Sequence, residues 1–358
     1  MLDKDVFPPA TRRTRRQSLT AVTLVKRRSP TASVVFDTYW RFAVERQEIL
    51  FRRVRGQAAP WTRDSILSQY KFTNAYRAVD RVSQYLIRSV IYAGSHDARD
   101  TVFRVLLFKL FNKIETWQLL ERTHGELGVG SFDVSGFDRT LTAATDAGAS
   151  IYSGAYIMPS GPASIRQSKK HRMHLELLAI LMRENFTERL LAARSMEEAY
   201  KLLLSIPGIG PFLAYQFVTD LNYSNHLNFS EMEFVVPGPG ARDGMKKCFT
   251  DLGDYSESDA IKWVAERQAD EFAARSLVFP SLWGRPLQLI DCQNLFCEVD
   301  KYSRVRHPEI SGYSGRTRIK QKFSANPAPF RPWFPPKWKI NDRVGAVEPP
   351  MRTDLLAD

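Results

Sequence analysis

The amino-acid sequence predicts an all-α fold of many helices. Apolar residues recur every three or four positions along most of the region between residues 34 and 303, which is the spacing of one helix face. No stretch shows a convincing alternation of apolar and polar residues, and no internal repeat is present. The chain has 358 residues, 44% of them hydrophobic, which is enough for a substantial core. We therefore expect a helical body over residues 34–323.

The helices follow one another in a definite order. The first spans residues 34–55 and ends near Gly56 and Pro60, and the second, over 74–92, has the same amphipathic pattern. Residues 100–120 are apolar around most of the helix circumference, which favours a central buried helix. Further helices are expected at 133–147, 170–184, 186–193, 196–205, 211–221, 240–250, 258–275 and 287–303.

The two ends of the chain have compositions that do not favour helices. Residues 1–33 carry clustered Arg and Lys among Ser, Thr and Pro, so we expect a flexible basic arm. This arm either binds phosphates or is a solvated N-terminal segment without a role. Residues 324–358 are rich in Pro and Trp, which predicts an extended tail packed onto the body through its aromatic side chains.

The charge balance favours a polyanionic partner. Lys and Arg number 51 against 39 Asp and Glu, a formal net charge of +12. An excess of this size favours nucleic acid, although many basic proteins bind nothing specific. Two basic runs could contact a DNA backbone or could simply form a solvated face. Their members are Lys169, Lys170 and Arg172, then Arg316, Arg318 and Lys320.

Cysteine usage and hydropathy indicate the cellular setting. The three cysteines, Cys248, Cys292 and Cys297, are too few and too irregularly spaced for a disulfide framework, a zinc site or a four-cysteine iron–sulfur cluster. No apolar run is long enough for a membrane helix, and the first 28 residues lack the apolar segment of a signal peptide. We therefore expect a soluble cytoplasmic monomer without a metal or another cofactor.

A glycine-rich turn between two helices is the sharpest local motif. The turn reads Pro207-Gly208-Ile209-Gly210, and Pro211 begins the next helix, where its missing N–H is harmless. The two glycines permit positive φ angles and leave backbone N–H groups bare at a helix N-terminus, which suits a DNA phosphate. Ile209 is expected to fill the gap between the helices. The arrangement predicts a helix-hairpin-helix, with an ordinary glycine-rich turn as the alternative.

Two carboxylates follow this hairpin at a suggestive distance. In the helix-hairpin-helix DNA glycosylases that the hairpin resembles, an acid some twenty residues beyond the last glycine faces the sugar of a flipped nucleotide. Glu231 lies at that distance from Gly210, with Glu233 beside it. A carboxylate there stabilises the positive charge that develops when the glycosidic bond breaks, or activates a water. Solvated loop acids are the alternative, and the Asp and following His usual in these enzymes are absent.

Phe212 bears on the type of chemistry. Glycosylases that also cleave the strand carry a Schiff-base lysine two positions after the last hairpin glycine, and this chain has Phe212 there. We therefore expect a monofunctional enzyme.

A second turn, over residues 235–244, leads into a helix with Lys246 and Lys247 and could cradle a phosphate, with a plain loop as the alternative. It lacks the Gly-Lys-Ser/Thr ending of a nucleotide-binding P-loop.

Further polar residues are candidates for a base pocket. Lys71, Asn74 and Arg77 stand at helical spacings among opposite charges, so they either face a substrate or belong to an internal lattice of ion pairs. Asp291 and Glu298 share one face of the last long helix, because they are seven residues apart. With Asp300 and Lys301 they could line a pocket or form interhelical pairs.

Several segments together resemble one family. Residues 34–323 are similar to the alpha-glutamyl/putrescinyl thymine pyrophosphorylases, whose core is also named the hydroxymethyluracil DNA kinase helical domain and which derive from helix-hairpin-helix glycosylases. The segments that carry the resemblance are Phe42 with Glu45-Arg46, Lys71-Phe72-Thr73-Asn74, Tyr76-Arg77, Asp80-Arg81, Phe108-Lys109-Leu110-Phe111-Asn112, the hairpin, Glu231 to Gly240, and Phe296-Cys297-Glu298-Val299-Asp300-Lys301-Tyr302.

The resemblance implies a glycosylase-like fold and double-stranded DNA with modified bases as the partner. Some members hypermodify thymine in phage DNA, and related bacterial proteins are antiphage glycosylases that excise bulky bases such as glucosylated hydroxymethylcytosine. We therefore expect an enzyme that flips out a modified pyrimidine and leaves an abasic site. The alternatives are a transferase that replaces pyrophosphate on activated hydroxymethyluracil with an amine, and a non-catalytic reader of modified DNA. A kinase is disfavoured because no kinase motif is present.

Overall fold

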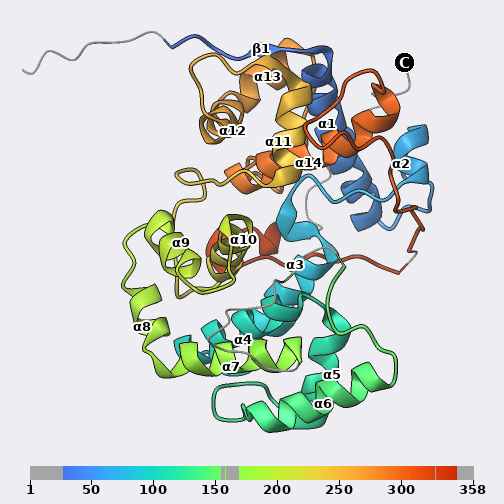
Figure 1. The fold of residues 1–358 in the computed structure, drawn as a ribbon. Coiled ribbons are helices and arrows are strands. Elements are labelled where there is room, and N and C mark those ends of the chain that lie inside the picture. The colour runs from blue at the N-terminus through green and yellow to red at the C-terminus, as the bar shows by residue number, and fades with distance from the viewer. Residues whose placement is uncertain (1–26, 155–157, 159–168, 327, 345–358) are drawn as a thin grey trace, which may run out of the picture.

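The computed structural model describes residues 27–154, 158, 169–326 and 328–344, and these form two lobes of helices (Figure 1). The upper lobe combines both ends of the described chain, whereas the lower lobe is made from its middle. The expectation of a mainly helical protein is confirmed. A short antiparallel pair of strands, β1 (Thr31–Ala32) and β2 (Phe249–Asp251), was not expected.

The upper lobe is built around one long, mostly buried helix, α14. It packs against α11, α1 and α12, and its inner face carries Leu295, Phe296 and Val299, all without exposed surface. The helices of this lobe are α1 (Val34–Val54), α2 (Ser65–Gln69), α11 (Pro239–Cys248), α12 (Glu257–Glu266), α13 (Gln268–Ala274) and α14 (Leu289–Arg306).

The close approach of α11 to α14 depends on Gly244. A Cβ placed on Gly244 would lie 1.9 Å from the backbone carbonyl oxygen of Phe296, so the helices must separate to admit even a methyl group. We expect Gly244→Ala to lower the free energy of unfolding by about 2–3 kcal/mol, as measured by chemical denaturation. Gly130→Ala is the control, because no atom lies within 4 Å of its added Cβ. Equal stability of both variants would contradict this account of the packing.

The lower lobe surrounds α4, which is buried along most of its length. Asp97 caps its first turn, and it ends at Asn112, whose φ of 47° is left-handed. The elements of this lobe are α3 (Arg81–Tyr85), the π-helix η2 (Leu86–Ile91), α4 (Ala98–Phe111), α5 (Ile114–His124), α6 (Val134–Asp146), α7 (Lys170–Arg183), α8 (Phe186–Leu191), α9 (Met196–Leu204) and α10 (Pro211–Leu221).

Some predicted helices are divided. The helix expected over 100–120 becomes α4 and α5, because the backbone turns at Asn112 and its side-chain oxygen accepts a hydrogen bond from the buried Lys109. The helix expected over 258–275 is interrupted at Arg267, between α12 and α13. The one expected over 74–92 starts late, because Asn74 is held in a loop by the Asp80 carboxylate and a 3₁₀ turn, η1 (Arg77–Val79), comes first.

The end of the basic arm is ordered, which corrects the expected flexibility for residues 27–33; residues 1–26 lie outside the described part of the chain. The backbone N–H of Arg28 donates to Asp254, and its guanidinium pairs with Asp251 at 2.6 Å. Strand β1 then pairs with β2. The small sheet therefore attaches the start of the described chain to the end of α11.

The tail packs through its aromatic residues against both lobes. Trp333 contacts Tyr92 of the lower lobe with ring centroids 5.1 Å apart, whereas Phe334 contacts Trp283 of the upper lobe at 5.7 Å. Its regular pieces are two 3₁₀ turns, η4 (Pro336–Trp338) and η5 (Asn341–Arg343). The tail thus runs along the seam between the lobes (Figure 1). In the described ranges no helix is both long and apolar enough to cross a membrane.

Candidate functional site

The hairpin turn, residues 207–210, lies between two helices, as the sequence predicts. It joins α9 to α10, and Gly208 has a φ of 86°, a conformation that glycine adopts without strain. Ile209 is buried beneath the turn. Gly210 is the N-cap of α10 and provides no side-chain cap, and a Cβ built on it meets no atom within 4 Å. The start of α10 is therefore open to an approaching anion.

A second helix begins beside this turn. Gly238 is the N-cap of α11, again without a side-chain cap, and Pro239 is the first helical residue. A Cβ on Gly238 would lie 2.8 Å from the ring of Phe212, which belongs to the first turn of α10. The two helix N-termini are therefore neighbours, and the ring of Phe212 lies between them. Phe212 stands at the position where strand-cleaving glycosylases carry a lysine.

Glu231 lies at the seam between the lobes. Its carboxylate pairs with Arg285 at 2.7 Å, and the two side chains are only 10% and 18% exposed. The Arg285 guanidinium in turn lies 3.9 Å from the centre of the Trp338 ring, so the tail covers the pair. Glu233, in contrast, is exposed. Of the two acids after the hairpin, Glu231 is the one that the fold holds in a defined environment.

Asp291 lies at the same seam and has a structural task. Its carboxylate accepts the backbone N–H of Gln288 at 3.0 Å, completing a capping box at the start of α14, and that of Arg77 at 2.9 Å. Burial, with a small contribution from the nearby Glu231, raises the pKa of Asp291 to about 7 against the opposing effect of these N–H donors. A carboxyl group that titrates near neutrality is suited to proton transfer, yet this one is enclosed by helix-capping bonds.

Arg77 is directed into the interior and not into a base pocket, which corrects its predicted role. Its guanidinium grips Asp220 of α10 through two hydrogen bonds of 2.5 and 3.0 Å, and Lys109 of α4 pairs with the same carboxylate at 2.8 Å. Asp220 has no exposed surface. Since the Arg77 backbone also binds Asp291, this residue links the upper lobe to the core of the lower one.

Two of the remaining pocket candidates, Asn74 and Lys301, are held in polar networks around α14. Glu298 accepts the backbone N–H of Thr73 at 2.9 Å and pairs with Lys301 at 2.7 Å, while Asn74 binds Asp80. Lys71 is exposed. These contacts match the alternative interpretation of the pattern, in which the charges pair within the protein.

Asp300 and Lys247 need correction. Asp300 is 2% exposed and pairs with Lys247 of α11 at 3.0 Å and with Arg304 at 2.5 Å. Lys247 is itself 2% exposed, so it cannot reach a DNA backbone, and Asp300 cannot line an accessible base pocket. Their pairing instead joins α11 to α14 in the interior of the upper lobe.

The other basic candidates lie on the surface. Lys246 is exposed and stands 5.9 Å from the ring of Tyr313, itself 69% exposed. Arg172 is half-buried and pairs with Asp138 and Glu176. The exposed members of the two basic runs are Lys169, Lys170, Arg316, Arg318 and Lys320.

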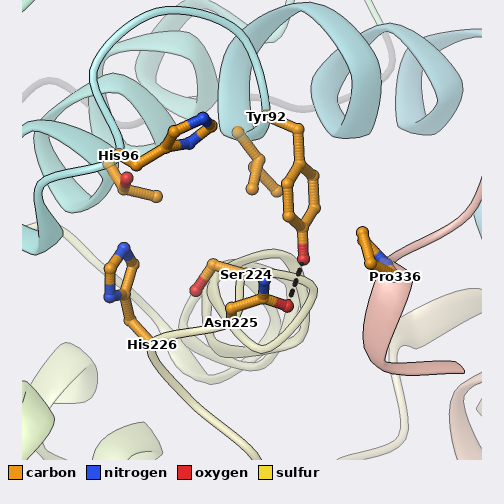
Figure 2. A pocket seen from close by; sticks show the side chains of 8 residues that line it. Tyr92, His96, Ser224, Asn225, His226 and Pro336 are labelled. Atoms are coloured by element: carbon orange, nitrogen blue, oxygen red, sulfur yellow. Dashed lines mark hydrogen bonds between the residues drawn. The ribbon is translucent and has the colours of Figure 1, made fainter.

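A cavity that the sequence did not reveal lies between η2, the start of α4 and the segment after α10 (Figure 2). It has a volume of about 280 Å³. Its wall combines segments more than 200 residues apart in the sequence, from Ile91 to Pro336 of the tail. No local sequence pattern therefore predicts it. The lining residues are Ile91, Tyr92, His96, Thr101, Ser224, Asn225, His226 and Pro336.

Comparisons with known proteins identify the family of this chain. The family described as "5-hmdU DNA kinase, helical domain" matches residues 33–312. The 5-hmdU DNA kinase of Bacillus phage SP10 is 27% identical over 297 residues, which cover 77% of this chain and 46% of that protein. The chain thus spans about half the length of this curated relative. No solved structure matches it. The chain belongs to the 5-hmdU DNA kinase helical-domain family.

Proposed function

We propose that this protein binds DNA that carries modified pyrimidines and hydrolyses the glycosidic bond of the modified base. The observation that carries the proposal is the placement of Glu231, at glycosylase spacing from an open hairpin and held at the seam between two lobes. The relative's name indicates a modified nucleoside in DNA as the target. A DNA-directed enzyme is also consistent with the net charge of +12.

The chemistry requires the carboxylate of Glu231 to face a deoxyribose. As the base departs, positive charge develops on the sugar, and an anion in a partly buried site stabilises that charge more strongly than one in water. In the structure the guanidinium of Arg285 forms an ion pair with this carboxylate, and the ring of Trp338 covers Arg285. Catalysis therefore requires the substrate to displace this pair.

A non-catalytic reader of modified DNA is the second candidate, and the same ion pair favours it. A carboxylate neutralised by Arg285 at 2.7 Å and covered by the tail is poorly placed to assist bond cleavage. In that case the hairpin and the seam bind DNA without reacting with it. The two candidates differ in whether a base leaves the DNA.

Mass spectrometry of the reaction products distinguishes these functions. Duplexes with a single 5-hydroxymethyluracil, a single glucosylated hydroxymethylcytosine or no modification would be incubated with the protein. We expect a free modified base and abasic DNA, lighter than the substrate by the mass of that base less one water. Selective binding without any change in mass would support the reader. DNA that gains an amine adduct when pyrophosphorylated hydroxymethyluracil and amines are supplied would support a transferase. Either outcome would overturn the hydrolase.

The hairpin can be tested separately through Gly210. Asp and Asn are both good N-cap residues of nearly equal size, so neither is expected to destabilise α10. Gly210→Asp, however, places a negative charge where a phosphate would bind. We expect it to weaken binding to all duplexes at least about tenfold relative to Gly210→Asn, measured by fluorescence anisotropy at low and moderate salt. Equal affinity of the two variants would show that this turn is not a phosphate anchor.

A further inference from the structure

The cavity in Figure 2 is formed by three parts of the chain that the fold brings together. Tyr92 ends the π-helix, His96 precedes α4, and Asn225 and His226 follow α10. In the close view the ring of His96 lies above that of His226, and the Tyr92 hydroxyl points to the side chain of Asn225 (Figure 2). Its 280 Å³ is at the small end of ligand pockets, which suits one small molecule.

The lining carries no permanent charge. None of its members is Asp, Glu, Lys or Arg. The neighbouring Lys337 is directed elsewhere, because its ammonium donates to the backbone carbonyls of Asn222, Ser224 and Leu227. Burial raises the pKa of Tyr92 to about 12, so its phenol is neutral. A phosphate or a carboxylate would find no fixed cation here, and a metal ion would find two imidazoles without a carboxylate.

The two imidazoles supply the unused hydrogen-bonding capacity of the cavity. The Tyr92 hydroxyl lies 2.9 Å from both the Tyr223 carbonyl and the Asn225 side-chain oxygen, and the Ser224 hydroxyl donates to Leu221. His96 is exposed and His226 is half-buried, and neither ring bonds to any residue within the described part of the chain. A neutral imidazole offers one N–H donor and one ring-nitrogen acceptor, and its flat face can stack on another ring.

We propose that this cavity binds an uncharged pyrimidine base, with His96 and His226 contacting its polar edge and Tyr92, Ile91 and Pro336 its faces. A pyrimidine presents alternating donors and acceptors in one plane, which matches two imidazoles and apolar walls. The volume admits one base with a short substituent and excludes a dinucleotide. The assignment of this base to DNA rests on the proposed function. The fit of a base to the cavity is independent of that function.

The tail turn η4 connects this cavity to the acid at the seam. Pro336 contributes to the cavity wall, Lys337 binds the carbonyls behind it, and Trp338 covers Arg285, the partner of Glu231. Three consecutive residues thus touch the cavity, the segment after α10 and the ion pair. A base in the cavity would contact the turn that covers the partner of the candidate catalytic acid.

The test measures base binding in two forms. Calorimetry would titrate 5-hydroxymethyl-2′-deoxyuridine into wild type and into the double variant His96→Ala/His226→Ala; anisotropy would compare duplexes with and without one 5-hydroxymethyluracil. Two lost hydrogen bonds predict an affinity for the nucleoside at least about tenfold lower. The preference for modified duplex should fall by a similar factor, with binding of unmodified duplex unchanged. Binding of the nucleoside alone, without any preference among duplexes, would assign the cavity to a free ligand.

Two further variants guard the interpretation. Asn228→Ala changes an exposed residue of the same segment outside the cavity and should behave as wild type. His226→Gln keeps a donor and an acceptor and should restore part of the affinity lost in His226→Ala, which a merely structural role would not produce. Full nucleoside affinity and full selectivity in the folded double variant would overturn the proposal. Base release without any effect of these variants would refute the cavity alone, whereas nucleoside binding without base release would refute the hydrolase alone.

Discussion

Replacing Asp220 by alanine is expected to lower the free energy of unfolding by about 3–5 kcal/mol, the usual cost of removing one partner from a buried ion pair. The Asp220 carboxylate has no exposed surface and compensates two buried cations, Arg77 at 2.5 Å and Lys109 at 2.8 Å. Without it, both remain in the core without this counter-charge. Chemical denaturation of wild type and variant at neutral pH measures the difference.

A matched surface pair provides the control. Glu197 and Lys201 pair at 2.7 Å on α9, but both side chains are more than half exposed, so Glu197→Ala should change stability by less than about 1 kcal/mol.

The pH dependence of stability gives a second check. Burial opposes ionisation of Asp220, but Arg77 and Lys109 outweigh it and lower the pKa. Its stabilisation is therefore complete above the unfolded pKa of about 3.9 and is lost as pH falls through the lower folded value. A small effect of Asp220→Ala at neutral pH would contradict this role.

Glu231→Gln is expected to reduce base release about 10²- to 10³-fold, because it keeps the size of the side chain and removes the charge opposite the developing cation. DNA affinity should remain close to that of wild type, since the hairpin is untouched. The measurement is single-turnover release of the modified base from an end-labelled duplex. Thermal unfolding of the variant accompanies it, because the substitution also breaks the pair with Arg285.

Glu233→Gln is the matched control, since this exposed acid lies two residues away. It should retain activity. With Phe212 in place of a Schiff-base lysine, the labelled strands should remain intact until alkali is added. Cleavage without alkali, trapped by borohydride, would exclude the monofunctional mechanism. Full activity of Glu231→Gln would move the catalytic role to another acid, with Asp291 and Glu298 also present along α14.

The features that the sequence predicted are those with local signals. The hairpin depends on residues 207–211, whose glycines and proline determine the turn directly. The ends of α1, α7 and α10 follow from periodicity, and Ser33 caps the start of α1. The division at Asn112 was missed because apolar residues continue on both sides of it. What breaks the helix is a left-handed residue bound by Lys109, a polar contact inside an apolar pattern.

The candidate site was less predictable because its parts come from distant segments. Arg77 and Asp220 are 143 positions apart, and Arg285 and Glu231 are 54 apart, so spacing along the chain does not reveal either pair. Lys247 illustrates the limit. A lysine beside another lysine favours a surface, but here the partner carboxylate of Asp300 lies on a different helix and draws the side chain inward.

The path of the chain also constrains how the protein forms during translation. The upper lobe joins Val35 to Cys248 across 213 positions and Thr38 to His307 across 269, so its core cannot close until α14 has left the ribosome. The lower lobe, from α3 to α10, is continuous and relies on nearer neighbours. Closing long loops is slow and leaves apolar surface exposed during folding. The face of α1 that is buried in the finished fold therefore stays exposed until α14 emerges. We therefore expect a chaperone to bind the apolar face of the nascent α1.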